Sequence, residues 1–258
     1  MSVTQLKSSS SVRDQVSEAE WQARVDLAAA HRGLAYYGVA DLTYNHLSLR
    51  VPGEPDKLLI KPADYLFEEV TASSLNKFTF DGKPADGRDK PLRGGGLVIH
   101  AGILNARPDI DAVFHTHTPA VMGVSAHKDG LLMINQHAVR FYERIIYHDF
   151  GGFEFEMDMR EPLMKDLGKA HVAILRNHGA LICGRTLKEA FTLHHMLDMA
   201  CQGQVAALSA GDGNYNTIPR DVCLFARDQI ENLEHAAGGK DWPAVMRLAE
   251  RLDPGFKE

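Results

Sequence analysis

The sequence predicts one domain of mixed α and β structure, on three observations. The chain has 258 residues, of which 45% are hydrophobic and 24% charged, as in ordinary globular domains near the upper size of a single core. Apolar residues at helical spacing alternate along the chain with short strand-like segments. No internal repeat or linker interrupts this pattern. We therefore expect a flexible arm over residues 1–16 and a single domain over residues 17–258.

The first helix is expected to begin at Ser17. Ser17 and Glu20 have the spacing of a capping box, in which the hydroxyl accepts the amide of the third helical residue and the carboxylate returns to the cap amide. Apolar residues recur at helical spacing from Trp21 onwards, and Gly38 suits a helix end with positive φ. The Trp21 face is predicted to pack against the rest of the domain.

The first half of the chain is expected to be rich in strands. Alternating side chains predict a half-buried strand over residues 42–51, with further short strands over 57–62 and 78–80. A glycine tripeptide, Gly94 to Gly96, then leads into a predicted helix over 97–106, which Pro108 ends.

The second half is predicted to contain more strands and then three helices. Expected strands cover residues 112–117, 131–134, 145–147, 171–176 and 180–183, with an Asn177-His178-Gly179 turn between the last two. Thr186 and Glu189 form a second possible capping box, which opens a long helix to Gly211. Two shorter helices are expected over 222–235 and 242–252.

Charge and hydropathy exclude several classes of protein. There are 28 Lys and Arg against 34 Asp and Glu, and a net charge of −6 disfavours a general nucleic-acid binder. No apolar run reaches the roughly 18 residues of a membrane span, and the N-terminus lacks a secretory signal. We expect a cytoplasmic protein without a membrane partner. Cys183, Cys201 and Cys223 lack ligand spacing and are interpreted as reduced packing residues.

Three of the 13 histidines form a candidate metal site. His115 and His117 are two residues apart on a predicted strand, so their imidazoles project from the same face. His178 lies in a turn, from which a ligand can be directed at a neighbouring strand. Three imidazoles with an open fourth position suit Zn²⁺ first, and alternatively Mn²⁺ or Fe²⁺. The adjacent His194 and His195 point about 100° apart on a helix and are not expected to share a metal.

Several stretches, in this order, resemble the class II aldolase and adducin head domain family over about residues 18–210. They are TYNHLSLRVPG, FEEVTASSL, VIHAGILNARPDIDAVFHTHTPAVMGVSAHKDGLL, RFYERIIYHDF and ILRNHGALICGRTLKEAF. The resemblance implies a three-layer α/β/α sandwich with a mostly antiparallel central sheet. It also implies His115, His117 and His178 as metal ligands, and a homo-oligomer, a tetramer, with sites at subunit interfaces.

The sequence departs from the family's sugar-phosphate aldolases at its catalytic position. Those enzymes carry a glutamate 19 residues before the HxH pair to move a proton, and this chain has Gly96 there. The serine pair expected before that glutamate is Gly94-Gly95, and the Thr-Gly of the phosphate pocket is Ala63-Asp64. An aspartate would repel a phosphate, so a sugar-phosphate aldolase is disfavoured.

The favoured function is a metal-dependent carbon–carbon lyase, a decarboxylase or aldolase acting on a small oxo or hydroxy acid or a sugar derivative. A Lewis-acid metal can supply the electron sink for such a reaction without the family's glutamate. Tyr142, Glu143 and His46 are candidates for proton delivery. Arg93 or Arg140 could bind a substrate carboxylate as a bidentate fork.

Two other functions remain open. YNHLSLRVP, EVTASSL and HTHTPA resemble adducin heads more than sugar-phosphate aldolases, which allows a non-catalytic oligomerisation or binding module. A metal-assisted dehydratase or epimerase ranks below both, because such reactions also need a placed acid or base.

Overall fold

The computed structural model describes residues 11–87, 89–211, 213–237 and 239–258. The arm predicted over residues 1–16 therefore lies largely outside the described residues. At its described end, Ser11 caps a one-turn helix, α1 (Val12–Gln15), whose residues are not buried.

The main helices match the predicted ones closely. Ser17 caps α2 (Glu18–Tyr36), and Thr186 caps α6 (Leu187–Leu208). The helices predicted over 222–235 and 242–252 are α7 (Arg220–Ala237) and α8 (Trp242–Leu252). The elements that were not predicted are α4 (Pro119–Ser125), α5 (Arg160–Leu167) and the short turns η1 (Phe67–Glu69), η3 (Ala138–Phe141), η4 (Met157–Met159) and η5 (Pro254–Lys257). The helix expected over 97–106 starts as a π-helix, η2 (Gly96–Ala101), and continues as α3 (Gly102–Ala106). Among these described helices, none has the length and hydropathy of a membrane span.

Seven strands of the described residues form one sheet in the order β3-β2-β1-β4-β7-β6-β5. They are β1 (His46–Val51), β2 (Glu54–Ile60), β3 (Asn76–Thr79), β4 (Ala112–Thr116), β5 (Ile145–His148), β6 (Val172–Leu175) and β7 (Gly179–Gly184). Neighbouring strands pair antiparallel except for β5 and β6, which are parallel. The mostly antiparallel sheet is therefore confirmed.

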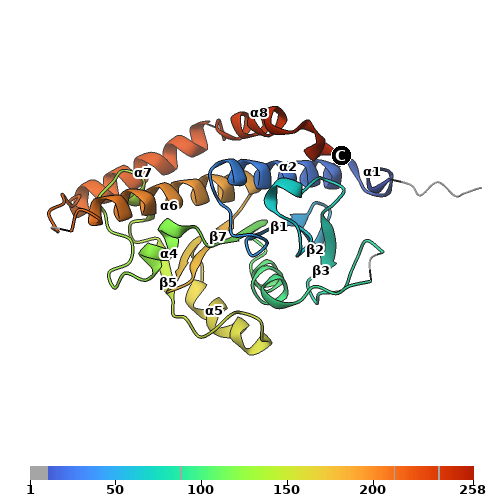
Figure 1. Ribbon diagram of the computed structural model, residues 1–258, viewed down its shortest axis with the longest axis horizontal. Coiled ribbons are helices and arrows are strands. Elements are labelled where there is room, and N and C mark those ends of the chain that lie inside the picture. The colour runs from blue at the N-terminus through green and yellow to red at the C-terminus, as the bar shows by residue number, and fades with distance from the viewer. Residues whose placement is uncertain (1–10, 88, 212, 238) are drawn as a thin grey trace, which may run out of the picture.

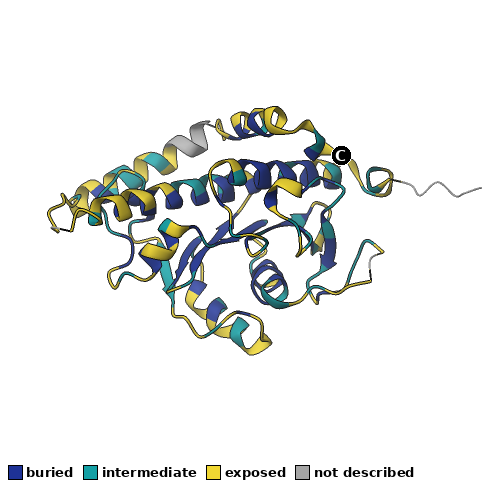
Figure 2. Ribbon diagram, viewed as in Figure 1, coloured by how far each residue is buried: buried dark blue, intermediate teal, exposed yellow. Residues whose placement is uncertain are grey.

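Helices cover both faces of this sheet, which confirms the three-layer α/β/α fold. Figure 1 shows α2, α6 and α8 on one face and α5 with the η2–α3 helix on the other. The two apolar cores follow the alternation of β4, since Phe114 packs into the α2–α6 core and Val113 into the opposite one. Burial is continuous between the layers in Figure 2, so the strands are covered on both sides.

Helix α2 packs by the predicted Trp21 face and by further residues. Trp21 is partly buried and packs against the core beside Val25 and Ala28. Leu27 and Leu34 are fully buried as well, because α8 and the sheet enclose α2 from both sides. The capping box is only half formed: Ser17 accepts the amide of Glu20, but the Glu20 carboxylate pairs with Arg24 and Lys77 at 2.9 and 2.8 Å.

Two predicted strand segments are also corrected. Residues 131–134 form no strand, because the amides of Leu131 and Leu132 donate to the side chains of Tyr147 and Gln204 instead of to a neighbouring strand. The strand expected over 42–51 starts only at His46. Leu42 has a φ of +45°, which is incompatible with an extended backbone.

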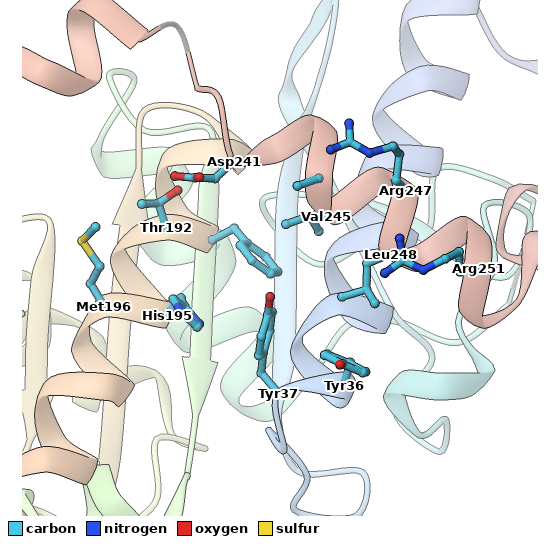
Figure 3. Close-up of a pocket in the computed structure, with 12 residues that line it drawn as sticks. Tyr36, Tyr37, Thr192, His195, Met196, Asp241, Val245, Arg247, Leu248 and Arg251 are labelled. Atoms are coloured by element: carbon cyan, nitrogen blue, oxygen red, sulfur yellow. The ribbon is translucent and has the colours of Figure 1, made fainter.

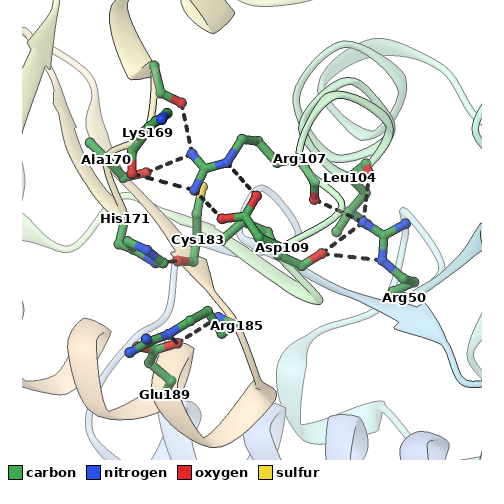
Figure 4. Close-up of polar contacts among 12 residues, drawn as sticks. Arg50, Leu104, Arg107, Asp109, Lys169, Ala170, His171, Cys183, Arg185 and Glu189 are labelled. Atoms are coloured by element: carbon green, nitrogen blue, oxygen red, sulfur yellow. Dashed lines mark hydrogen bonds and ion pairs between the residues drawn. The ribbon is translucent and has the colours of Figure 1, made fainter.

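Arginine side chains tie the loops together at the sheet edge where β4 begins and β7 ends (Figure 4). The Arg50 guanidinium donates to the carbonyls of Leu104 and Ile110 at 2.6 and 2.8 Å. Arg107 pairs with Asp109 at 2.7 Å and lowers the pKa of that carboxyl to about 2. This edge satisfies its own polar groups, and the predicted site lies at the opposite edge, where β4 ends.

We expect His31 to make stability depend on pH. Its ring is fully buried on α2, with Nδ1 donating to the Leu27 carbonyl at 2.7 Å, and burial lowers its pKa to about 3. Between pH 6.5 and 3 the unfolded chain binds a proton at this residue that the folded chain does not bind. The free energy of unfolding should therefore fall by about 1.4 kcal/mol per pH unit from this residue as the pH is lowered.

Urea titrations of wild type and His31→Leu at pH 7.5, 6 and 5 would measure this slope. The variant should lose about that amount of pH dependence. An equal slope in both proteins would contradict the assignment.

Candidate functional site

The end of β4 sends alternate side chains to opposite faces of the sheet. Thr116 and Thr118 face α6, where Thr116 Oγ1 lies 2.7 Å from His194 Nε2 and Thr118 donates to Asp198 at 2.5 Å. His115 and His117 consequently project from the other face, as the i, i+2 spacing predicts. Helix α6 thus binds the strand end through the two threonines, and neither His115 nor His117 takes part in this contact.

The Asn177-His178-Gly179 turn brings the third histidine to the same place. Asn177 has a φ of +58°, a conformation that asparagine tolerates better than most residues. At position 179 a Cβ atom would collide with the Thr116 carbonyl and lie 2.9 Å from the His117 ring, so only glycine allows this close approach. The turn therefore aims His178 at the end of β4.

The three predicted histidines converge through their Nε2 atoms. His115 Nε2 lies 2.9 Å from His117 Nε2, which lies 3.2 Å from His178 Nε2. One ligand atom from each of the three residues fits within 4.8 Å of the other two. One chain therefore brings three imidazole nitrogens together in the arrangement of a three-histidine metal site.

Each of these imidazoles has its other nitrogen next to an acceptor. His117 Nδ1 lies 3.0 Å from the Asp41 carboxylate, and His115 Nδ1 lies 3.0 Å from the Ala180 carbonyl. His178 Nδ1 faces the buried Glu154 carboxylate at 3.5 Å, a distance beyond a good hydrogen bond. Oxygen acceptors of this kind fix the tautomer of metal-binding histidines and increase their basicity.

These contacts imply that the converging nitrogens are unprotonated. If His115 and His117 each donate through Nδ1, their Nε2 atoms present two lone pairs to one another at 2.9 Å. Such an arrangement is repulsive unless a cation lies between the nitrogens. Tetrahedral Zn²⁺ with Zn–N distances of about 2.0–2.1 Å would hold nitrogens roughly 3.3 Å apart. The donor set and its spacing thus fit a zinc-like ion.

The electrostatics of the cluster favour neutral imidazoles at His115 and His117. Burial holds the pKa of His115 well below its usual range, and the neighbouring His46 and His117 act in the same direction. Burial also lowers the pKa of His117, although Asp41 opposes the change. Burial alone would raise the pKa of the Glu154 carboxyl, but its contact with His178 outweighs this and the pKa is lowered. Neutral imidazoles at His115 and His117 are the form that binds a cation.

His46 and Arg93, both predicted from the sequence, lie on the side of the cluster where β1 begins. His46 pairs with His115 across β1 and β4, and the two ring centroids are 5.1 Å apart. A Cβ atom on Gly95 would lie 3.3 Å from His46 Nε2, so this glycine segment borders His46. Arg93 is exposed and directly precedes the segment.

The structure does not bring Tyr142, Glu143 or Arg140 to the cluster of their own chain. Tyr142 and Glu143 precede β5, whose first residue pairs with the first residue of β6, whereas His178 follows the end of β6. Glu143 pairs with Arg220 of α7 at 2.9 Å, and Arg140 Nη1 lies 3.0 Å from Met196 Sδ of α6. The parallel pairing of β5 and β6 separates them from the histidines.

A side chain at position 96 would require the end of the Leu92 side chain to move. A Cβ atom there would lie 2.6 Å from Leu92 Cδ1 and 3.7 Å from Ile60 Cδ1. Apolar side chains thus occupy the space beside this glycine. The carboxylates near the histidines are instead those of Asp41 and Glu154, which the sequence analysis missed. No sequence signal marks them, because both reach the histidines from distant loops.

A phenylalanine-rich loop borders His178. The ring centroids of Phe150 and Phe153 lie 5.9 and 6.4 Å from that of His178, and Phe153 stacks on Phe155 at 5.7 Å. These rings are 47%, 63% and 64% exposed in chain order. They form an apolar wall at one side of the cluster, and Glu154 is buried beneath it.

Lys61 fastens the loop that carries Asp41. Its buried amine donates to the carbonyls of Thr43, Pro62 and Tyr65 at 2.9, 3.2 and 2.8 Å. Burial lowers the pKa of this amine to about 8. In the same loop, Asn45 accepts the backbone amide of His117 at 2.9 Å. The loop is therefore anchored at two points next to the histidine that Asp41 contacts.

A separate pocket of about 450 Å³ lies between α2, α6 and α8 (Figure 3). Its lining includes Tyr37 and His195, whose ring centroids are 4.7 Å apart, and Arg247 and Arg251 of α8. His194 instead contacts Thr116, so the adjacent His194 and His195 diverge as predicted. None of the predicted site residues lines this pocket.

Comparison with known proteins identifies the family of this fold. The family model for the class II aldolase and adducin N-terminal domain matches residues 25–205. A crystal structure of an aldolase II superfamily protein from Pseudomonas syringae superposes with a TM-score of 0.89 at 40% identity, covering 96% of this chain and 99% of that one.

Two curated relatives illustrate the range of this similarity. A Caulobacter vibrioides protein provisionally named as a class 2 aldolase is 39% identical over 248 residues, 96% of each chain. Alpha-adducin of Rattus norvegicus is 38% identical over 231 residues, 88% of this chain but 31% of the adducin. The similarity thus extends along nearly all of the Caulobacter vibrioides protein and along one part of a much longer protein.

We expect purified protein to bind about one equivalent of metal per chain. His115→Ala and His178→Ala should each abolish this, because two imidazoles do not form a stable site. Elemental mass spectrometry after equilibration with zinc or manganese would measure it. Absence of metal from the wild type under these conditions would refute the site.

Asp41→Ala should weaken metal binding by about 10- to 100-fold, since His117 loses the acceptor that orients its ring. Competition with a chromogenic chelator would give the affinity. Asp129→Ala, which removes an exposed carboxylate from another loop, serves as the matched control. Equal affinities in the two variants would show that Asp41 does not support the site.

Proposed function

The chain belongs to the class II aldolase and adducin N-terminal domain family, and on that premise we propose that it is a metal-dependent carbon–carbon lyase. Its substrate would be a small oxo or hydroxy acid, or a sugar derivative. The convergence of three Nε2 atoms whose Nδ1 atoms each face an oxygen acceptor carries this proposal.

His115, His117 and His178 would hold Zn²⁺, or alternatively Mn²⁺ or Fe²⁺. A bound ion of this kind polarises a substrate oxygen and stabilises the negative charge that develops when a carbon–carbon bond breaks. Asp41 and the Ala180 carbonyl keep the imidazoles in the ligating tautomer. The rings of Phe150 and Phe153 beside His178 give this space one apolar side.

The residues around the cluster support an acid substrate over a sugar phosphate. Gly94 and Gly95 offer no hydroxyl groups, and Asp64 is exposed beside the end of β2, where it would repel a phosphate. We assign Arg93 to the substrate carboxylate, because it directly precedes the glycine segment that borders His46.

We also propose a homo-oligomer, specifically a tetramer. Within one chain, Tyr142, Glu143 and Arg140 lie away from the histidines. Their proposed roles in proton delivery and carboxylate binding therefore require that they reach the site of another subunit.

The alternative is a non-catalytic oligomerisation or binding module. The 38% identity to alpha-adducin over 88% of this chain favours it, as does the lack of a glutamate at position 96. The two functions differ in a measurable way, because only the lyase turns over a substrate.

We expect zinc- or manganese-loaded wild type to release CO₂ or an aldehyde from members of a panel of small oxo and hydroxy acids. His178→Ala should be inactive, since it lacks the metal. Coupled assays for both products would detect turnover, with ketose phosphates as the comparison substrates that should not be cleaved. Metal-loaded protein that turns over none of the acids would favour the binding module. Cleavage of ketose phosphates by wild type would show that Gly96 was misinterpreted.

A further inference from the structure

Next to the histidine cluster, three side chains, Ser48, His100 and His46, form an array joined by hydrogen bonds. Ser48 and His46 are two residues apart on β1 and share a face, and His100 comes from the η2 helix that packs on this face. Ser48 Oγ lies 2.6 Å from His100 Nδ1, and His100 Nε2 lies 2.6 Å from His46 Nδ1. Ser48 and His100 are both fully buried.

The direction of these hydrogen bonds follows from what Ser48 can do. In the described part of the chain, His100 Nδ1 is the hydrogen-bond partner that the structure gives to the Ser48 hydroxyl. If Ser48 accepted from His100, its own hydrogen would be buried without an acceptor, at a cost of about 1–3 kcal/mol. Ser48 therefore donates, and His100 Nδ1 accepts.

This assignment passes along the array to His46. Because His100 Nδ1 accepts the hydrogen bond from Ser48, the His100 ring is neutral and carries its single proton on Nε2. That N–H donates to His46 Nδ1. A neutral His46 must then carry its own proton on Nε2.

The His46 Nε2 atom faces the candidate substrate space. It borders Gly95, where the absence of a side chain leaves room, and its ring packs beside His115. Among the described residues, His46 Nε2 has no hydrogen-bond partner. It is also absent from the buried polar atoms that lack a partner, so it keeps some exposure to solvent. A free N–H at this position is available to a ligand oxygen.

We propose that Ser48 and His100 fix His46 as a neutral hydrogen-bond donor, with its Nε2–H directed at a carboxylate or enolate oxygen of a ligand held beside the histidine cluster. Ser48 and His100 are positioning residues, and His46 contacts the ligand. A preorganised donor of this kind stabilises an oxygen on which negative charge develops. The ligand part rests on the proposed function, whereas the direction of the array does not.

The tautomer can be measured without metal or substrate. Nitrogen-15 NMR of metal-free protein with labelled histidines should show His46 with a protonated Nε2 and an unprotonated Nδ1, with His46→Gln used to assign its signals. Ser48→Ala should move both signals towards averaged positions, because the residue that sets the direction is gone. A protonated Nδ1 in wild type, or unchanged signals in Ser48→Ala, would overturn the proposal.

Ligand binding tests the donor itself. Oxalate resembles an enolate and serves as the probe for zinc-loaded protein in isothermal titration calorimetry. His46→Leu should bind it at least about tenfold more weakly, as expected for a lost hydrogen bond to a charged group. His46→Gln, which keeps an N–H near the position of Nε2, should remain within about threefold of wild type.

The two failures are distinguishable. Protein that holds zinc and binds oxalate equally well as wild type and His46→Leu would refute the donor while leaving the metal site intact. Protein that takes up no zinc would refute the proposed function, and the NMR measurement would still decide the direction of the array.

Discussion

The pairing of β4 with two antiparallel neighbours is the constraint on which the site depends. On one side its register sets His46 opposite His115, and on the other it sets Ala180 opposite Thr116, directly after the turn that carries His178. Four imidazoles from three segments therefore meet at one edge of the sheet. A shift of one residue in either register would turn His115 and His117 towards α6 and dissolve the cluster.

Around this edge, glycines allow close packing, and polar groups from distant segments orient the imidazoles. Gly179 and Gly95 permit close approach at the points where a Cβ atom would crowd Thr116 or His46. Asp41 and the Ala180 carbonyl orient the imidazoles, and Lys61 holds the loop that carries Asp41. The opposite edge of the sheet, with Arg50 and Arg107 bound to loop carbonyls, satisfies its own polar groups. The histidine cluster and the arginine contacts thus lie at opposite ends of the sheet.

Much of the fold was predictable, because it depends on local patterns. Ser17 and Thr186 each cap the helix that the sequence predicts, and the period-two spacing of His115 and His117 places both on one face. Local patterns failed where a side chain replaced a backbone partner, as at Leu131 and Leu132. They failed again at Glu20, whose carboxylate is drawn from the helix cap to Arg24 and Lys77.

The family, the mixed α/β character and the three histidines can be read from motifs and from periodicity along the chain. The groups that accompany the histidines follow from tertiary contacts. Asp41 contacts His117 across 76 positions of sequence, Glu154 contacts His178 across 24, and His100 contacts His46 across 54. The parallel pairing of β5 and β6 takes Tyr142 and Glu143 away from the cluster. Such contacts depend on strand register and loop closure, and neither can be predicted from the residues of a single segment.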